Sequence, residues 1–132
     1  MNQPHNIGVA SQIGTYSDEV EVTQPGRMLF TAGTPGLTPE GYLSDTFEGQ
    51  AEQAWKNILH LLESAGMGVE HHVKIVQYLV RPEDIRAYAP IRARVLGPHR
   101  PASMLMVVSA LPRPEFLIEI EACAAIINSY AS

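Results

Sequence analysis

Cysteine is nearly absent from this chain: Cys123 is the single one among 132 residues, so no disulfide can form within it. Long apolar runs are missing too, and no stretch approaches the roughly 20 apolar residues that span a bilayer. The N-terminal segment MNQPHNIGVASQIG has neither the basic start nor the apolar centre of a signal peptide. These absences predict a cytoplasmic protein that has no membrane partner.

Basic residues are scarce as well. The chain carries 9 Lys and Arg against 14 Asp and Glu, for a net charge of -5, and its lysines are Lys56 and Lys74. Proteins that bind nucleic acid need clustered cations that displace counterions from phosphates, and the arginines here are scattered. We therefore expect no nucleic-acid partner, although a small anion held by one arginine remains compatible with this charge.

The residues that build metal and phosphate sites also lack the necessary spacing. His71 and His72 are adjacent and would point to opposite faces of a strand, while His5, His60 and His99 are far apart in sequence. No metal site is predicted. The segment 33–41 has the glycines of a phosphate-binding loop but not its lysine or its spacing. Cys123 lies in an apolar segment and is predicted to be an inert core thiol.

The composition favours a folded domain. Hydrophobic residues make up 45% of the chain and charged residues 17%, which is enough apolar material for a core. The length fits a single domain spanning residues 1–132.

The first half of the chain predicts a hairpin and a helix. After an N-terminal arm of about fifteen residues, Val20 to Ala32 is predicted to form two strands joined by a turn at residues 23–26, where Pro25 and Gly26 favour it. A glycine- and proline-rich loop follows. Apolar residues at spacings of three and four then predict a helix, which Ser44 or Asp45 would cap and Gly66 would end.

The second half predicts three strands and another helix. The run from His72 to Val80 is so apolar that both faces of this strand should be covered. Glu83 to Leu96 favours a helix that Pro90 would kink or split, unless Pro90 lies in the first turn of a shorter helix. Two closing strands are predicted over Met104 to Ala110 and Glu115 to Ile126.

The predicted element order is β-β-α-β-α-β-β, which gives an α/β (α+β) sandwich with two helices on one face of a mixed sheet. Two helices cannot cover both faces of this sheet. The remaining apolar face predicts self-association.

The run from Ile118 to Cys123 carries the candidate chemistry. In a strand, Glu119, Glu121 and Cys123 share one face, and the two carboxylates lie about 6.5–7 Å apart. Two interpretations are open. The glutamates are either solvated carboxylates of a half-exposed strand, or acid–base groups whose pKa is raised in a partly apolar cleft.

Four blocks in order resemble the RidA/YjgF family over about residues 13–125. These blocks are Ile13-Gly14-Thr15-Tyr16-Ser17, Leu29-Phe30-Thr31-Ala32-Gly33, the helix from Gln50 through Asn57 to Gly66, and Leu111-Pro112 with Ile118-Glu119-Ile120-Glu121-Ala122. The resemblance implies a homotrimer of chorismate-mutase-like subunits with sites in clefts between neighbours. It also implies hydrolysis of reactive imines and enamines, such as 2-aminoacrylate, without a metal or organic cofactor.

Carried over by position, the resemblance assigns roles to individual residues. Glu119 would activate water, Tyr16 would close the pocket, and Ala32-Gly33 would form the turn beside it. Backbone N–H groups near Gly33 and Met104 would orient the substrate.

The chain departs from the family at the arginine that binds the substrate carboxylate. Its position is Ser103, which can make one neutral hydrogen bond but not the charged fork of a guanidinium. The resemblance also leads us to expect a serine where Ala32 stands. Either the pocket serves a larger or more apolar imine, anchored by Arg92 or Arg100, or the catalytic function has been lost.

The sequence therefore predicts a homotrimeric deaminase-like hydrolase that acts on a small imine or enamine and is specific to one pathway. The alternative is a non-catalytic trimer that binds a small ligand or a regulatory partner. A ribonuclease activity, also associated with relatives of this family, is disfavoured by the acidic charge.

Overall fold

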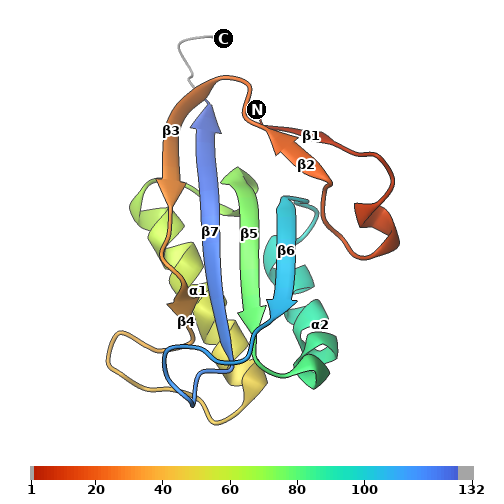
Figure 1. Cartoon of the computed structure of the whole chain (residues 1–132). Coiled ribbons are helices and arrows are strands. Elements are labelled where there is room, and N and C mark those ends of the chain that lie inside the picture. Colours follow the sequence, from red (N-terminus) through yellow and green to blue (C-terminus); the bar gives the residue numbers. More distant parts are fainter. Residues whose placement is uncertain (1, 128–132) are drawn as a thin grey trace.

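The computed structural model describes residues 2–127 and centres on a mixed sheet in the order β3-β7-β5-β6 (Figure 1). These strands span Pro25–Phe30 (β3), Ile118–Ile127 (β7), His72–Leu79 (β5) and Ala102–Val107 (β6). A short strand, β4 (Thr34–Pro35), also pairs with β7. β7 is antiparallel to β3, β4 and β5, whereas β5 and β6 run parallel. β7 therefore pairs with every other strand of this sheet except β6.

The alternation of side chains along β7 follows the prediction. Ile118, Ile120 and Ala122 are buried on one face, while Glu119 and Glu121 are half-buried on the other. Strand residues alternate with a period of two, so the sequence alone was sufficient to assign these faces.

Helix α1 (Phe47–Ser64) matches the predicted helix but begins at a different cap. The side chain of Thr46 accepts a hydrogen bond from the N–H of Gly49 at 3.0 Å. The prediction that Ser44 or Asp45 caps the helix is therefore wrong. At the other end, Gly66 adopts φ 73°, the left-handed conformation that glycine accepts most readily.

Helix α2 (Ile85–Leu96) follows a 3-10 turn, η3 (Pro82–Asp84), so the predicted helix from Glu83 has two parts. Pro90 lies inside α2, beyond its first turn, and the helix continues through it. Of the outcomes expected at Pro90, a split at this residue and a place in the first turn are both wrong. Pro90 is exposed, so its ring lies toward solvent and only one N–H donor is lost.

Both helices pack on one face of the sheet, and the core lies between these layers (Figure 1). The largest fully buried side chains include Trp55, Ile58, Leu62, Ile75, Tyr88 and Ile118. The predicted architecture, a mixed sheet with two helices on one face, is confirmed. Among the described residues, no helix combines the length and the apolarity that crossing a membrane requires.

The N-terminal prediction is wrong. Strand β2 (Glu19–Glu21) pairs with β1 (Gln3–His5), while β3 pairs with β7, so no hairpin joins β2 to β3. The segment expected to be an arm instead contains β1 and a 3-10 turn, η1 (Ala10–Gln12). A strand pattern identifies a strand but not its partner, because pairing depends on groups that are distant in sequence.

The two closing strands are also shifted from their predicted bounds. β6 begins two residues before Met104 and ends at Val107, and β7 begins at Ile118 rather than Glu115. Residues 108–117 form the connection between them, which is longer than the four residues 111–114 expected from the prolines.

Candidate functional site

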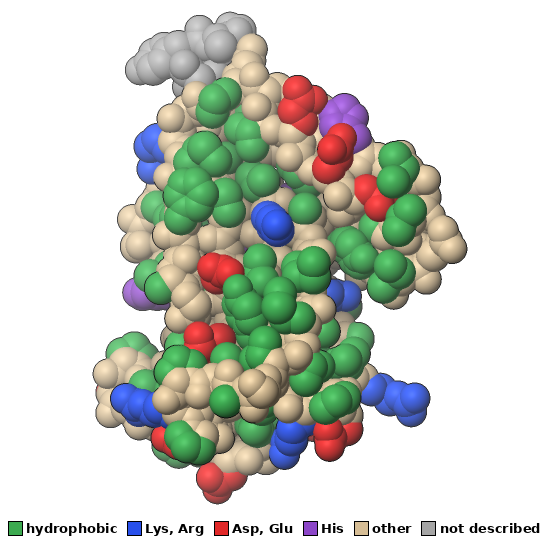
Figure 2. Space-filling view, viewed as in Figure 1, with side chains coloured by type: hydrophobic (Ala, Val, Ile, Leu, Met, Phe, Trp, Pro, Cys, Tyr) green, Lys and Arg blue, Asp and Glu red, His purple; other side chains and the backbone are tan. Residues whose placement is uncertain are grey.

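The sheet face opposite the helices is open and largely apolar. Phe30, Met28 and Met104 are 73%, 48% and 50% exposed. Figure 2 shows hydrophobic side chains gathered over the strands of this face, with acidic and basic side chains among them. A face this apolar is suited to covering by another protein surface or a ligand.

Glu119 lies on this open face, beside the turn that follows β3. A methyl group added at Gly33 would lie 2.8 Å from Glu119 Oε1, so only a glycine leaves the carboxylate its present position. Among the described residues, no group donates a hydrogen bond to the Glu119 carboxylate or forms an ion pair with it. Burial raises its pKa above the ordinary glutamate value. An unpaired carboxylate with a raised pKa can exchange protons with a bound water.

The loop that carries Gly33 is fastened to α1. The amide of Asn57 donates hydrogen bonds to the carbonyl oxygens of Pro35 and Leu37, at 3.0 and 2.9 Å. Gly36 lies so close to the backbone of Gln50 that a methyl group there would clash at 2.2 Å. The turn beside Glu119 is therefore fixed by the helix, as a preorganised site requires.

Glu121 is in a different state from Glu119. The hydroxyl of Tyr78 donates a hydrogen bond of 2.5 Å to Glu121 Oε1, and this bond raises the pKa of Tyr78. Tyr78 also lies directly opposite Glu119 in the ladder between β5 and β7. Its role was missed in the sequence, where its strand could be recognised but not its partner. Because the Tyr78 hydroxyl is bonded to Glu121, Glu119 is the unpaired carboxylate of the two.

Ser103 is directed away from the open face. Its hydroxyl accepts a hydrogen bond of 3.0 Å from the amide of Gln77, which is fully buried and also binds Met104 O at 2.8 Å. The oxygen of the same amide, Gln77 Oε1, accepts a hydrogen bond of 2.7 Å from the hydroxyl of Tyr88. Ser103 thus belongs to a polar network that reaches the buried Gln77 and Tyr88. The side chain of its neighbour Met104 is half-exposed on the open face.

Tyr16 lies beside the edge strand of the sheet and is separated laterally from Glu119. Ser17 bridges to Ala102 on the edge strand β6, and β5 separates β6 from β7. One subunit therefore does not bring Tyr16 beside Glu119. The prediction that Tyr16 closes a site of a neighbouring subunit stays a prediction.

The two arginines proposed as substitutes are engaged elsewhere in the single chain. Arg92 lies over the ring of Tyr88 at 5.9 Å. Arg100 donates from Nη1 to the carbonyls of Gly97 and His99 at 2.6 and 3.1 Å. Neither contacts Glu119.

One cation, Lys74, lies on the open face itself, and two arginines line a pocket near the start of β7. Lys74 is exposed and lies opposite Cys123 in the ladder between β5 and β7. Burial raises the pKa of the Cys123 thiol, and the charge of Lys74 partly offsets this by lowering it. Just before the start of β7, Arg81 and Arg113 line a pocket of about 500 Å³ together with Leu117. Arg81 is bound to the Asp84 carboxylate at 2.7 Å. Within residues 2–127, no three His, Cys, Asp or Glu side chains are grouped so as to hold a metal ion.

Comparison with known proteins adds to this geometry. The profile of the family described as Endoribonuclease L-PSP matches residues 8–126. A RutC family protein of Pyrococcus horikoshii is 32% identical over 114 residues, which cover 85% of this chain and 87% of that protein. The protein named Reactive Intermediate Deaminase A, chloroplastic, of Arabidopsis thaliana is 30% identical over 116 residues, covering 86% of this chain and 60% of the plant protein.

A solved structure shares the arrangement over nearly the whole chain. The crystal structure of YyfB from Yersinia pestis, a member of the conserved Rid protein family, superimposes with a TM-score of 0.83 at 30% identity. The match covers 95% of this chain and 98% of that one.

Proposed function

Because the chain belongs to the Endoribonuclease L-PSP family, the RidA/YjgF family of Rid proteins, we propose that it hydrolyses a small imine or enamine and releases ammonia. Glu119 is the proposed catalytic residue. The similarity to a protein named as a reactive intermediate deaminase supports this chemistry.

The single observation that carries the proposal is the state of the Glu119 carboxylate. It lies against Gly33 on an apolar face, is unpaired among the described residues, and has a raised pKa. Glu121, two residues away on the same face, is bonded to Tyr78. Of these two carboxylates, only Glu119 is free to take a proton from water.

The proposed reaction converts an imine and water to a carbonyl compound and ammonia. An enamine substrate first gains a proton on carbon and loses one from nitrogen, which makes it the imine. Glu119 accepts a proton from water while the water oxygen bonds to the imine carbon. The same proton then passes to nitrogen and gives a carbinolamine. Transfer of the hydroxyl proton to nitrogen, through Glu119, then lets the C–N bond break, so that the carbonyl forms and ammonia leaves. No electrons are exchanged with a further reactant.

The substrate is proposed to be specific to one pathway and different from 2-aminoacrylate. Ser103 bonds to Gln77 and offers no cation for a carboxylate. A charged hydrogen bond contributes about 1.5–3 kcal/mol to binding. Its absence would therefore lower the affinity for a small carboxylate substrate by about one to two decades. Met104 and the apolar face around it favour a larger or more apolar imine.

The proposed assembly is a homotrimer with sites between subunits. In one chain the open face is uncovered and Tyr16 is distant from Glu119. A neighbouring subunit seated on this face would cover the apolar side chains and bring its own Tyr16 to the site.

The proposal is tested by ammonia release from a panel of enamines generated in situ, including 2-aminoacrylate. Glu119→Gln should lower kcat/KM by roughly 100-fold or more, the range for loss of a general base. The matched control, Glu121→Gln on the same strand face, should retain most activity. The ionised form of Glu119 accepts the proton, so activity should be lost as the pH falls. Because burial raises the pKa of Glu119, the midpoint of this loss should lie above the ordinary glutamate pKa.

Equal loss in both variants, or turnover unaffected by Glu119→Gln, would show that another group activates water. Circular dichroism and light scattering of each variant would separate catalytic loss from loss of the fold or the assembly.

A second candidate is a non-catalytic trimer that binds a small ligand. The bond between Ser103 and Gln77 favours it, because the residue that we place at the family's carboxylate-binding position is bonded within the chain. This alternative predicts no acceleration over spontaneous hydrolysis, combined with a rise in melting temperature when the ligand is added.

A further inference from the structure

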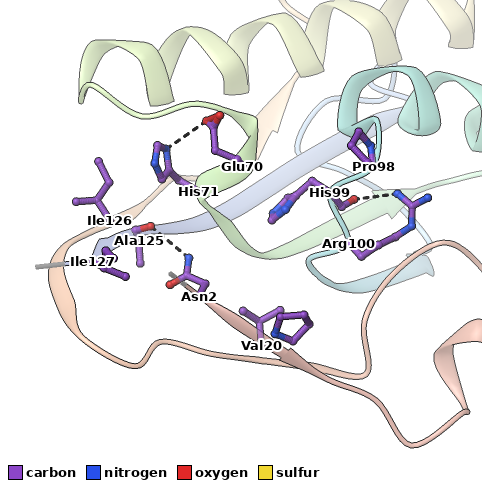
Figure 3. Close-up of a pocket in the computed structure, with 11 residues that line it drawn as sticks. Asn2, Val20, Glu70, His71, Pro98, His99, Arg100, Ala125, Ile126 and Ile127 are labelled. Carbon is purple, nitrogen blue, oxygen red and sulfur yellow. Dashed lines mark hydrogen bonds and ion pairs between the residues drawn. The ribbon is translucent and has the colours of Figure 1, made fainter. Parts of the chain in front are cut away.

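A pocket separate from Glu119 lies beneath the antiparallel pair of strands β1 and β2, which we call the N-terminal hairpin. Its volume is about 780 Å³. Figure 3 shows His71 and Ile126 on one side, His99 and Arg100 on the other, and Asn2 and Val20 on the hairpin. Its walls therefore come from β1 and β2, the end of β7, the 3-10 turn η2 (Val69–His71), and the connection from α2 to β6.

The hairpin that covers this pocket is fixed at two points. Ser17, just before β2, donates its N–H to Pro101 O at 3.1 Å and its hydroxyl to Arg100 O. At the other end, Asn2 Nδ2 donates to Ala125 O at 3.3 Å. The strand pairing that the sequence did not predict thus creates the roof of a defined cavity.

The pocket wall is mostly apolar. Pro4, Val20, Pro98, Ala125 and Ile126 contribute to it. Small-molecule sites typically have volumes of about 300–1,000 Å³, apolar walls and a few placed polar groups. The volume here fits a ligand with a ring or a branched chain.

The polar groups of the pocket are few, and the hydrogen bonds that they already make determine which donors and acceptors remain for a ligand. His99 Nε2 lies 2.8 Å from His72 O and must donate to it, which leaves Nδ1 of the neutral ring as an acceptor. His71 Nδ1 accepts the N–H of Gly68 at 2.9 Å, so its Nε2 carries a proton that can be donated.

Arg100 supplies the charge at the edge of the pocket. Its Nη1 binds two carbonyl oxygens, of Gly97 and His99, and these bonds hold the guanidinium in place. No carboxylate among residues 2–127 forms an ion pair with it. Glu70, the acidic residue of the wall, lies 3.4 Å from His71 instead.

We propose that this pocket binds an aromatic monocarboxylate. The carboxylate pairs with the guanidinium of Arg100, and the ring packs against Val20 and Ile126. One unpaired cation matches one carboxylate, whereas a second carboxylate would face Glu70. Arg100 was one of two candidate anchors for the imine, but it is bonded at this pocket and the proposed deaminase does not use it. The site therefore stands without that activity.

The proposal is tested by calorimetric titration of the full chain with 3-phenylpropionate, its neutral amide, and the dicarboxylate phenylmalonate. The monocarboxylate should bind roughly tenfold or more tightly than the amide, the ratio expected from a charged hydrogen bond. The dicarboxylate should bind more weakly than the monocarboxylate.

Variants locate the binding. Arg100→Gln should lower the affinity for 3-phenylpropionate roughly tenfold or more. Val20→Trp should also weaken binding, because the indole would occupy the space in which the ligand ring packs. Arg94→Gln is the matched control, because Arg94 is an exposed arginine that pairs with Glu52 on α1. It should bind as the wild type does.

The titration of Glu119→Gln separates this site from the deaminase. Unchanged binding in this variant supports the pocket, whatever its turnover. Binding lost in Glu119→Gln but kept in Arg100→Gln would place the ligand on the sheet face and overturn the proposal. Equal affinity for acid and amide, or no binding of 3-phenylpropionate up to millimolar concentration, would overturn it as well.

Discussion

Glu119 and Glu121 show how one residue type acquires two states on a single strand face. They are two positions apart on β7 and face the same way. Tyr78 reaches Glu121 and compensates its charge with a short hydrogen bond, whereas Glu119 meets the backbone at Gly33 and no donor. Partner geometry, rather than burial alone, decides which carboxylate is available for chemistry.

His72 is a buried titratable residue on the helix side of the sheet. Its Nδ1 lies 3.0 Å from Val69 O, its ring packs edge-on against Trp55, and its Nε2 has no partner among the described residues. Burial lowers its pKa to about 4, assisted by the nearby His99 and His71, while Glu70 acts in the opposite sense. This histidine is neutral in the folded protein near pH 7.

Folding should therefore weaken in mild acid. Between pH 6.5 and about 4 the unfolded chain takes up a proton at His72 that the folded chain does not, so the free energy of unfolding falls as the pH falls. The full effect is about 3 kcal/mol at 1.36 kcal/mol per pH unit. Urea unfolding across this range measures it.

The variant His72→Gln does not titrate, so its stability should depend less steeply on pH. His60→Gln, at an exposed position of α1, is the control and should keep the wild-type slope. A wild-type slope in His72→Gln would assign the acid sensitivity to other groups.

At the scale of elements, the start of α1 depends on one hydroxyl. Ser44, Asp45 and Thr46 are all residue types that cap helices, and only the backbone conformation selects among them. Thr46 has the extended conformation of a cap, φ -103° and ψ 150°, and binds the Gly49 N–H. Ser44 instead serves the turn by accepting the N–H of Thr46.

Thr46→Ala should consequently lower the free energy of unfolding by about 1 kcal/mol, the usual effect of removing an N-terminal cap. Asp45→Ala is the matched control, since no hydrogen bond from the exposed Asp45 side chain occurs among the described residues, and should change stability by less than about 0.5 kcal/mol. Urea denaturation of both variants checks this. A larger loss in Asp45→Ala would show that the cap has been misassigned.

At the scale of the whole molecule, the open face is the dominant feature. Phe30 and Met104 stand on it with large exposed areas, and the acidic net charge of -5 does not favour a polyanionic RNA partner. Covering this face by self-association would bury apolar area that a free subunit leaves in water. A homotrimer is the assembly that we propose.

Phe30→Asp tests this assembly, because it places a charge within the surface to be buried. Light scattering should find a trimer of 14.5 kDa chains for the wild type and smaller species for the variant. Tyr42→Asp, at a comparably exposed aromatic position on a loop, should remain trimeric. A monomeric wild-type protein would contradict the shared-site arrangement.

The sequence by itself determined the main elements and the faces of the sheet. The period-two pattern of β7 placed Glu119 and Glu121 together, and the three- and four-residue spacing of apolar residues identified α1 with its end near Gly66. These are local properties, because side-chain direction follows from backbone geometry over a few residues.

Only the tertiary structure decided which groups meet. It paired β2 with β1 rather than β3, directed Ser103 to Gln77, and bonded Tyr78 to Glu121. It also enclosed the pocket beside Arg100. Each of these contacts joins residues that are many positions apart, and strand partners, buried polar pairs and cavities depend on how elements pack, which no local sequence pattern specifies.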